Sequence, residues 1–378
     1  MYQRFTQKLH SWLAKVPQNK APIAFEEASR YAEKFGGQLH TYQAQFDTTS
    51  DNSSTPVPLG YTTPSPLIQH FQSGLKAIYL DFTHPGFRFC LNHLIDPDQQ
   101  VVYHPGLKFQ DLPISRQKLP TKIKKLKGTV AYLSNTASDH YGHWMRMTLP
   151  SLNVYQKYLS LDDIDYFYIG DLPTIPRFIT ECFEFLGIPS HKIIHQPCRG
   201  ERTLIALTEW KQHTNGLTYI DHSTYEFTRK LVASQLDLTD NCCYNPRVYI
   251  TRGNVQWRRV KNESEVFELL RGYDVEFRVL DQISIREQAQ IFYHADVIIA
   301  PHGSALTNLI FGKENSKVLE IFAHNHIDKT SFALAAHSNM HYYYMKGVDQ
   351  PNLAVAPCYE DITVDLGLLE DFCKTHLT

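Results

Sequence analysis

The sequence predicts an α/β protein built from two Rossmann-like domains whose parallel sheets face each other across a cleft. The first observation is the length of 378 residues, which exceeds one typical domain and suggests two. The second is that strand-like apolar segments alternate with amphipathic helical segments from about residue 129 onward, as in βαβ units. The third is that this alternation forms two blocks, separated by the break NCCYNP at 241–246.

The composition narrows the class of protein. Lys and Arg total 37 and Asp and Glu total 39, so the chain lacks the basic excess of a nucleic-acid binder. The chain has seven cysteines, an odd number, and no two of them have CxxC spacing. Its N-terminal segment does not have the pattern of a secretory signal. We therefore expect a reducing, cytoplasmic location. No apolar run reaches the roughly 18 residues that a membrane span needs.

Residues 1–128 are expected to form an N-terminal extension. Residues 1–20 are amphipathic and basic, and two interpretations stay open: a helix docked on its own domain, or a peripheral membrane contact. Residues 41–66 are rich in Thr, Ser, Asn and Pro, which indicates a loop or linker, and 76–104 contain short strand-like pieces. The basic run 116–128 is either a solvated loop or a contact for an anionic surface or acceptor.

The first block, residues 129–240, is expected to form the acceptor-side domain. Its predicted strands are 129–133, 165–170, 191–196 and 202–207, and its predicted helices are 143–159, 174–187 and 222–236.

The second block, residues 247–350, is expected to form the nucleotide-binding domain. Ser284 followed by Glu287 predicts a capping box at the start of one helix. The final segment, 351–378, contains a helix that we expect to pack back on the first domain. The predicted elements of the block are strands at 247–252, 275–280, 296–300 and 317–322, and helices at 262–272, 284–295 and 304–311.

The segment APHGSALTNLIF, residues 300–311, is the first candidate site. Ligands of open α/β sheets bind beyond the carboxyl ends of the strands. The segment places a turn there, followed by a helix N-terminus whose free N–H groups attract anions. Gly303 and Ala305 lack bulk, and His302 and Ser304 carry donors, which favours phosphate binding. The alternative is a tight strand-to-helix turn in which His302 is a solvent-facing cap.

The strand ends on either side of this turn carry charged residues. Arg252 ends the strand RVYITR, and Arg258, Arg259 and Lys261 follow it; arginine suits bidentate contact with a diphosphate. Surface ion pairs are the alternative. Glu320 ends the strand KVLEI, where a carboxylate could accept hydrogen bonds from a ribose or form a strand-end ion pair.

The segment SDHYGHWMR follows the first strand of the first block. Its Asp139 or His143 could take a proton from an acceptor hydroxyl. His140 and His143 have HxxH spacing, but no further ligands accompany them, so no metal site is predicted. The alternative is a capping Asp beside a packed His–Trp pair. The chain has neither GxGxxG nor GxxxxGK[ST], which weakens dinucleotide and P-loop interpretations.

Taken together, these motifs resemble the glycosyltransferase family 61 domain, in a bacterial-type form, over roughly residues 129–325. Four separated motifs agree in order and spacing, which makes the resemblance fairly specific. They are His143-Trp144 with Leu149-Pro150, Tyr249-Ile250-Thr251-Arg252 with Arg259 and Asn262-Glu263, His302 to Asn308 with Phe311, and Leu319-Glu320.

The resemblance implies a GT-B-like fold and inverting, metal-independent transfer of a sugar from a nucleotide sugar, with UDP expected, to a glycan, glycolipid or other hydroxyl acceptor. It implies no cofactor and a role in polysaccharide biosynthesis. It also implies that Arg252 and the HGSALTN turn contact the donor. With the residues argued above, the expected donor-binding set is Arg252, Arg259, His302, Gly303, Ser304, Ala305, Asn308 and Glu320.

This chain departs from the family pattern at two places. The usual HGAGLTN has Ser304 and Ala305 here, and Met147 stands where many members carry an acid. The second departure leaves His143 and Asp139 as the candidate general bases. It also keeps open a catalytically inactive nucleotide-sugar-binding protein of the same fold. A nucleotide-dependent oxidoreductase is a third alternative, which the missing glycine fingerprint disfavours.

Overall fold

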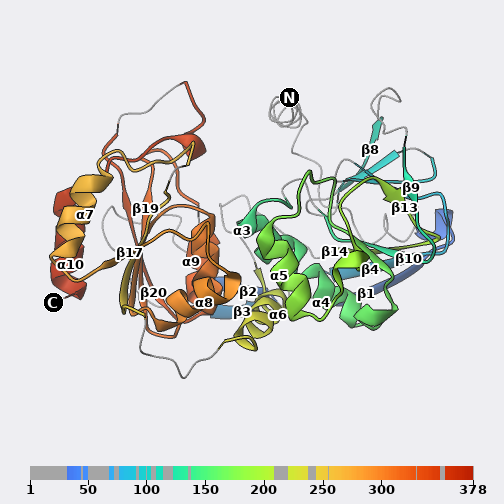
Figure 1. Cartoon of the computed structure of the whole chain (residues 1–378), viewed down its shortest axis with the longest axis horizontal. Helices are drawn as coiled ribbons and strands as arrows, with labels where there is room; N and C mark the ends of the chain where they lie inside the picture. The colour runs from blue at the N-terminus through green and yellow to red at the C-terminus, as the bar shows by residue number, and fades with distance from the viewer. Residues whose placement is uncertain are drawn as a thin grey trace.

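The computed structural model shows a mixed α/β protein with sheets in both halves of the molecule (Figure 1). The residues described are 32–43, 46–49, 68–71, 76–90, 93–98, 100–103, 108–113, 122–134, 138–207, 220–236, 244–253, 255–328, 330–349 and 354–377. The amphipathic segment 1–20, which the sequence analysis singled out, lies outside them.

The first half contains a six-stranded sheet in which β10, β11, β12 and β14 run parallel. Two antiparallel strands, β1 and β4, complete the sheet on one side. The expected separate extension is therefore partly wrong, because residues before 129 belong to this sheet. In spatial order the strands are β1 (Gln38–Gln43), β4 (Lys76–Phe82), β14 (Arg202–Leu207), β10 (Thr129–Tyr132), β11 (Tyr166–Tyr168) and β12 (Ile193–Ile194).

Two further sheets accompany it. A second six-stranded sheet has the order β8 (Lys108–Pro113), β7 (Gln100–Tyr103), β6 (His93–Ile95), β5 (Arg88–Cys90), β13 (Cys198–Arg199) and β9 (Lys124–Lys125). A three-stranded sheet joins β15 (Ile220–Asp221), β2 (Phe46–Thr49) and β3 (Ile68–Phe71).

The second half contains an all-parallel sheet of five strands, as expected for a Rossmann-like domain. The strand β20 is an addition, since its aromatic-rich sequence HYYYMK was not predicted as a strand. The order is β17 (Glu276–Arg278), β16 (Arg247–Ile250), β18 (Val297–Pro301), β19 (Lys317–Phe322) and β20 (His341–Lys346).

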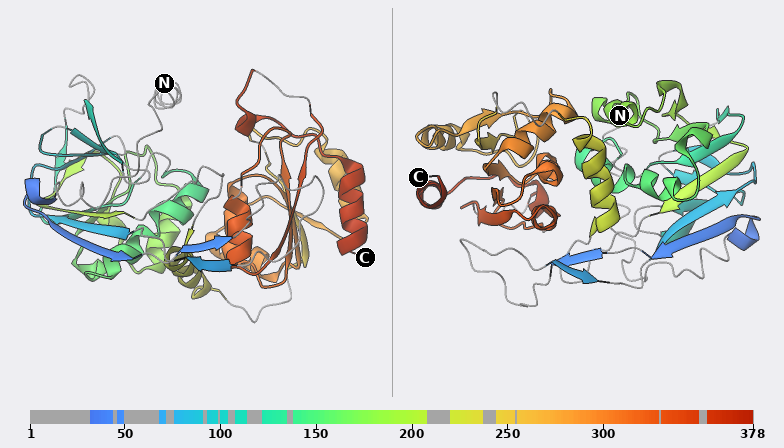
Figure 2. Two further views of the ribbon diagram at one scale, coloured as in Figure 1. Left: turned by 180° about the vertical axis from the view of Figure 1, so that it is seen from behind. Right: turned by 90° about the horizontal axis from the view of Figure 1, so that it is seen from below.

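Helices cover the sheets as the alternating pattern requires (Figure 2). A capping box has two hydrogen bonds, and the one from the N3 backbone to the N-cap side chain is confirmed: the Glu287 N–H donates to Ser284 Oγ at 3.1 Å. The helices are α3 (Tyr141–His143), the π-helix η2 (Trp144–Thr148), α4 (Ser151–Gln156), α5 (Arg177–Phe185), α6 (His222–Ala233), α7 (Glu263–Arg271), α8 (Ile285–His294), α9 (Thr330–His337) and α10 (Leu366–His376), with 3-10 helices η3 (Leu161–Asp163), η4 (Ser190–Lys192), η5 (Ser304–Phe311) and η6 (Pro357–Tyr359). Within the described part of the chain, none of the helices combines the length and apolarity that a bilayer span requires.

The position of the last helix corrects the sequence prediction. Helix α10 packs on α7 in the second half rather than on the first domain (Figure 1). Its apolar positions Leu369 and Phe372 lie in a buried cluster with Val266 and Leu270 of α7. The amphipathic pattern of α10 was visible in the sequence, but the pattern does not specify which surface buries it.

The two halves share one hydrophobic core. A single cluster of buried side chains contains Trp144 and Phe167 from the first half and Phe292 and Leu306 from the second. Buried polar contacts add to it: the Glu181 carboxylate of α5 accepts from the Ile285 N–H at 2.7 Å and from Arg177 Nε at 2.6 Å. An acceptor at the N-terminus of α8 satisfies a donor that the helix cannot, so this bond ties the two halves together.

We expect Glu181→Ala to destabilise the protein by about 1–3 kcal/mol, because the buried Ile285 N–H loses its acceptor. The midpoint of urea unfolding measures this. The matched control is Glu268→Ala on α7, whose side chain is 74% exposed and pairs with Arg271, and it should stay within about 0.5 kcal/mol of wild type. Equal effects of the two variants would contradict a structural role for the Glu181 contact.

Candidate active site

The carboxyl ends of β16 and β18 lie side by side, because these strands pair in parallel. Arg252 follows the first strand and His302 follows the second. Arg252 Nη1 donates to the His302 carbonyl oxygen at 2.9 Å. The expectation that the two residues share one edge of the sheet is therefore confirmed.

Gly303 makes this contact possible. Its backbone is extended, and a Cβ at this position would overlap Nη1 of Arg252. The Arg252 guanidinium can therefore lie against the turn only if position 303 is a glycine. This explains why the PHGSA segment has a glycine there.

We expect Gly303→Ala to weaken nucleotide binding by about 10- to 100-fold, because displacing Arg252 removes a hydrogen bond from a charged group. Titration calorimetry with UDP measures the change. Gly272→Ala is the matched control, since its added Cβ would meet only the Leu269 carbonyl oxygen at 3.3 Å. Wild-type affinity in a folded Gly303→Ala protein would show that Arg252 does not need this position.

His302 is held from behind by Glu320. Its Nδ1 lies 2.6 Å from Oε1 of the Glu320 carboxylate, and its ring stacks on Phe322 at 5.0 Å. Glu320 is fully buried and also accepts from Ser331 Oγ and the Tyr342 hydroxyl. Glu320 therefore orients the His302 imidazole. The sequence predicted that Glu320 would accept hydrogen bonds from a ribose, but its carboxylate is buried and a ribose cannot reach it.

The two adjacent arginines after β16 point to different places. Arg259 Nη2 and Nε donate to Asp361 Oδ2 at 2.9 and 3.2 Å, and its side chain is 62% exposed. Arg258 instead has a left-handed backbone, with φ 58°, and its Nε is buried. From the sequence, Arg259 rather than Arg258 was expected in the donor-binding set, because spacing alone cannot distinguish two consecutive arginines.

Arg252 and Arg258 form a partly desolvated pair of positive charges. Burial and then the neighbouring Arg258 lower the pKa of Arg252 to about 10, and burial lowers the pKa of Arg258 as well. Each Nε is buried without a hydrogen-bond partner among the described residues. Unpaired buried donors and adjacent like charges are costly, so this arrangement favours an anionic ligand.

Helix η5 presents the rest of the HGSALTN motif. Ser304 is exposed at its start, Ala305 is half-buried and Asn308 is fully buried. The Asn308 side chain accepts from the Tyr141 hydroxyl at 2.5 Å and donates to Gln288 Oε1 at 2.9 Å. Asn308 thus links the turn to the first half of the chain instead of lying open to a donor.

The first-half motif lies directly against this turn. A Cβ on Gly142 would come within 3.0 Å of Thr307 Oγ1 and 3.5 Å of the Ser304 Cβ. The motif continues as the π-helix η2, and such turns are frequent at functional sites. The two motifs selected from the sequence are therefore brought together.

His143 and Asp139 differ in their surroundings. His143 Nδ1 lies 3.2 Å from the Met147 thioether, and burial, Arg146 and His140 lower the pKa of His143 to about 4. Asp139 is 51% exposed, and its carboxylate lies 3.9 Å from His140. At neutral pH, His143 is therefore an uncharged imidazole, while Asp139 faces solvent.

Asp328 is a site residue that the sequence analysis missed. It follows β19 at the carboxyl edge and accepts from the Thr330 N–H at 2.7 Å. Burial raises the pKa of Asp328, but the Thr330 hydrogen bonds and the charges of His302 and Arg146 outweigh it and lower the pKa. Asp328 also raises the pKa of His143. Its position after an apolar strand was the available signal.

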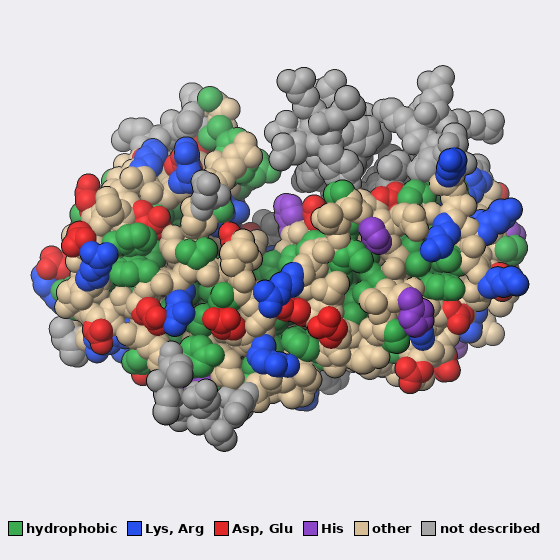
Figure 3. All heavy atoms as spheres, in the orientation of Figure 1, with side chains coloured by type: hydrophobic (Ala, Val, Ile, Leu, Met, Phe, Trp, Pro, Cys, Tyr) green, Lys and Arg blue, Asp and Glu red, His purple; other side chains and the backbone are tan. Residues whose placement is uncertain are grey.

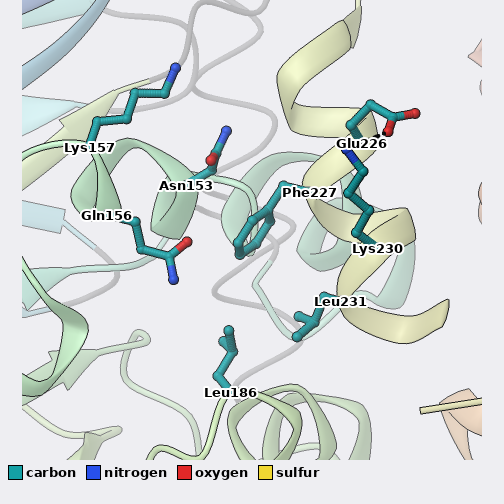
Figure 4. A pocket seen from close by; sticks show the side chains of 8 residues that line it. All are labelled: Asn153, Gln156, Lys157, Leu186, Glu226, Phe227, Lys230 and Leu231. Carbon is teal, nitrogen blue, oxygen red and sulfur yellow. Dashed lines mark ion pairs between the residues drawn. The ribbon is translucent and has the colours of Figure 1, made fainter. Parts of the chain in front are cut away.

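The surface shows a notch between the two halves (Figure 3). A separate pocket of about 640 Å³ lies elsewhere, between α4 and α6 (Figure 4). Its only carboxylate, Glu226, pairs with Lys230 at 3.1 Å. It contains none of the predicted site residues, so we place the chemistry at the junction of the halves. The lining residues are Asn153, Gln156, Lys157, Leu186, Glu226, Phe227, Lys230 and Leu231.

Part of the chain matches a known family. Residues 141–319 match the family model described as Glycosyltransferase 61, and this range contains His143, Arg252 and the HGSALTN turn. A search of curated proteins found no significant match to the chain. A domain of this family implies glycosyl transfer between a sugar donor and an acceptor. The chain therefore carries a glycosyltransferase family 61 domain and is a glycosyltransferase of EC 2.4 type.

Proposed function

We propose that the protein transfers a sugar with inversion from a nucleotide sugar, a UDP-sugar in our expectation, to a hydroxyl of a glycan or glycolipid. In this proposal the two halves form a GT-B-like pair, with the donor on the second half and the acceptor on the first. No metal ion is required, because protein cations bind the diphosphate.

The pair of desolvated arginines carries the donor proposal. Arg252 and Arg258 present positive charge and unpartnered donors at the edge of a parallel sheet, within the described residues. His302, oriented by Glu320, supplies a further polar group beside them. Fixed donors of this kind stabilise the negative charge that develops on the leaving diphosphate, and they usually contribute more to the rate of such reactions than any other single effect.

The acceptor hydroxyl attacks the anomeric carbon from the face opposite the leaving group. The new bond joins the acceptor oxygen to that carbon, while the bond from the carbon to the phosphate oxygen breaks and its electrons leave with the nucleoside diphosphate. His143 takes the hydroxyl proton through Nε2, since its Nδ1 faces Met147. Asp328 favours the imidazolium that forms. Asp139, exposed and next to His140, is the weaker candidate for the base.

A thermal-shift screen with UDP, GDP, CMP and NAD, each with and without EDTA, tests the proposal. A ligand at 100 times its Kd should stabilise the folded protein by about 2.7 kcal/mol. We expect a shift with UDP that EDTA leaves unchanged. A shift that EDTA abolishes would overturn metal independence, and a shift with NAD alone would overturn the transferase donor site.

A further inference from the structure

Two loops of the second half are fastened to each other beside Arg258. Val260 and Ile362 form a parallel bridge, with hydrogen bonds of 2.8 Å from the Lys261 N–H to the Ile362 carbonyl and from the Ile362 N–H to the Arg259 carbonyl. The Asn262 side chain donates to the Val364 carbonyl at 3.0 Å and accepts from the Val364 N–H at 2.9 Å. We call the loops 255–262 and 357–364, held in this way, the clamp.

Arg259 closes the clamp at the outer side. Besides its two side-chain bonds to Asp361, its N–H donates to Asp361 Oδ1 at 2.9 Å. The left-handed backbone at Arg258 separates the side chains of Arg258 and Arg259. The Arg259 side chain binds Asp361, whereas the Nε of Arg258 is buried. The role of Arg259 is therefore to hold the clamp.

The clamp presents two aromatic rings. The centroids of Trp257 and Tyr359 lie 5.3 Å apart with an interplanar angle of 40°, and Tyr359 is 46% exposed. The two loops are joined by seven hydrogen bonds, so this exposed aromatic side chain is held in place before any ligand binds. A large apolar side chain exposed in this way is typical of a binding surface. Exposed aromatic rings on rigid loops are suited to binding planar ligands.

These rings adjoin the donor site. Trp257 precedes Arg258 in the chain, and Tyr359 and Cys358 both act electrostatically on the Arg258 guanidinium. Glu320, which holds His302, acts on the same guanidinium. Arg258 thus neighbours both the aromatic pair and Arg252, the other cation of the donor site.

We propose, on the basis of the proposed function, that Trp257 and Tyr359 bind the base of the nucleotide donor by stacking. The diphosphate of the same ligand would then lie at Arg252 and Arg258. Every nucleobase has a π-face, and stacking on an aromatic side chain contributes about 1–3 kcal/mol per base. The same interaction is absent for a diphosphate without a base. A comparison of UDP with inorganic pyrophosphate therefore isolates it.

Titration calorimetry on Tyr359→Ala and Trp257→Ala tests the inference. We expect each variant to bind UDP about 5- to 150-fold more weakly than wild type, the range that stacking energies give, and to bind pyrophosphate unchanged. Tyr359→Phe keeps the ring and should bind UDP like wild type. Thermal unfolding checks that each variant is folded, and we expect this of Tyr359→Ala because the Tyr359 side chain is 46% exposed.

Other outcomes separate this inference from the proposed function. Tight UDP binding by both alanine variants would overturn the stacking role while the donor site stands. A raised KM for the acceptor, with UDP affinity unchanged, would assign the rings to an acceptor sugar and overturn the inference. Failure of the wild-type protein to bind either UDP or pyrophosphate would instead overturn the proposed donor site, and with it the base position.

Discussion

Arg252→Ala is expected to lower the rate of sugar transfer by about 10²–10³-fold, the typical cost of removing one donor to a developing negative charge. The residue stands where β16 ends, donates to the His302 carbonyl and lies against Gly303. Its removal also leaves Arg258 alone to face the diphosphate. Initial rates with saturating acceptor measure the loss as a fall in kcat/KM for the donor.

Arg271→Ala is the matched control for this prediction. Arg271 is also an arginine of the second half, but it is 62% exposed and pairs with Glu268 on the outer helix α7. Its loss should leave both activity and the melting temperature near wild type, because exposed ion pairs contribute little. Near-wild-type transfer by a folded Arg252→Ala protein would refute the donor assignment.

His143→Ala is expected to lower kcat by about 10²–10⁴-fold, the usual contribution of a general base. Donor affinity should stay close to wild type, since the diphosphate-binding groups lie on the second half. The split between kcat and UDP affinity distinguishes a base from a residue that only supports the fold. Asp139→Asn, which changes an exposed carboxylate, should have a much smaller effect. The reverse order of the two variants would move the base to Asp139.

The pH profile gives an independent test of the same residue. His143 must be uncharged to take a proton, and its pKa is about 4, so kcat/KM should stay level from pH 7.5 to 5.5 and fall only at lower pH. An ordinary imidazole would lose activity below about pH 6.5. Met147→Glu places a carboxylate beside Nδ1, which favours the charged form, so the acid limb should move to higher pH. A limb that does not move would exclude His143.

The architecture of the second half could be predicted from its apolar periodicity. Strands β16, β18 and β19 lie where the pattern placed them, because buried parallel strands are continuous apolar runs. The first half was less predictable. Strands β1 and β4, from residues before 129, join its sheet through the antiparallel pairs β1–β4 and β4–β14, and such long-range pairing leaves no local mark in a single sequence.

The site was predictable at the level of motifs but less so at the level of side chains. Strand ends specify an edge, so Arg252 and His302 could be placed together from the sequence. Burial could not be specified in the same way: Glu320 and Asn308 are covered. The left-handed backbone that separates Arg258 from Arg259, and the approach of Asp328 to the first half, depend on tertiary contacts.

Helix α6 has a consequence for engineering chimeras of this enzyme. It belongs to the first half by chain order, yet Arg229 donates to the carbonyls of Ile310 and Gly312, and the Tyr225 hydroxyl lies 2.6 Å from Ser338 Oγ. A recombination point placed after α6, where the sequence blocks divide, would separate these partners and expose the shared core. Swapping whole halves at this point should therefore yield insoluble protein.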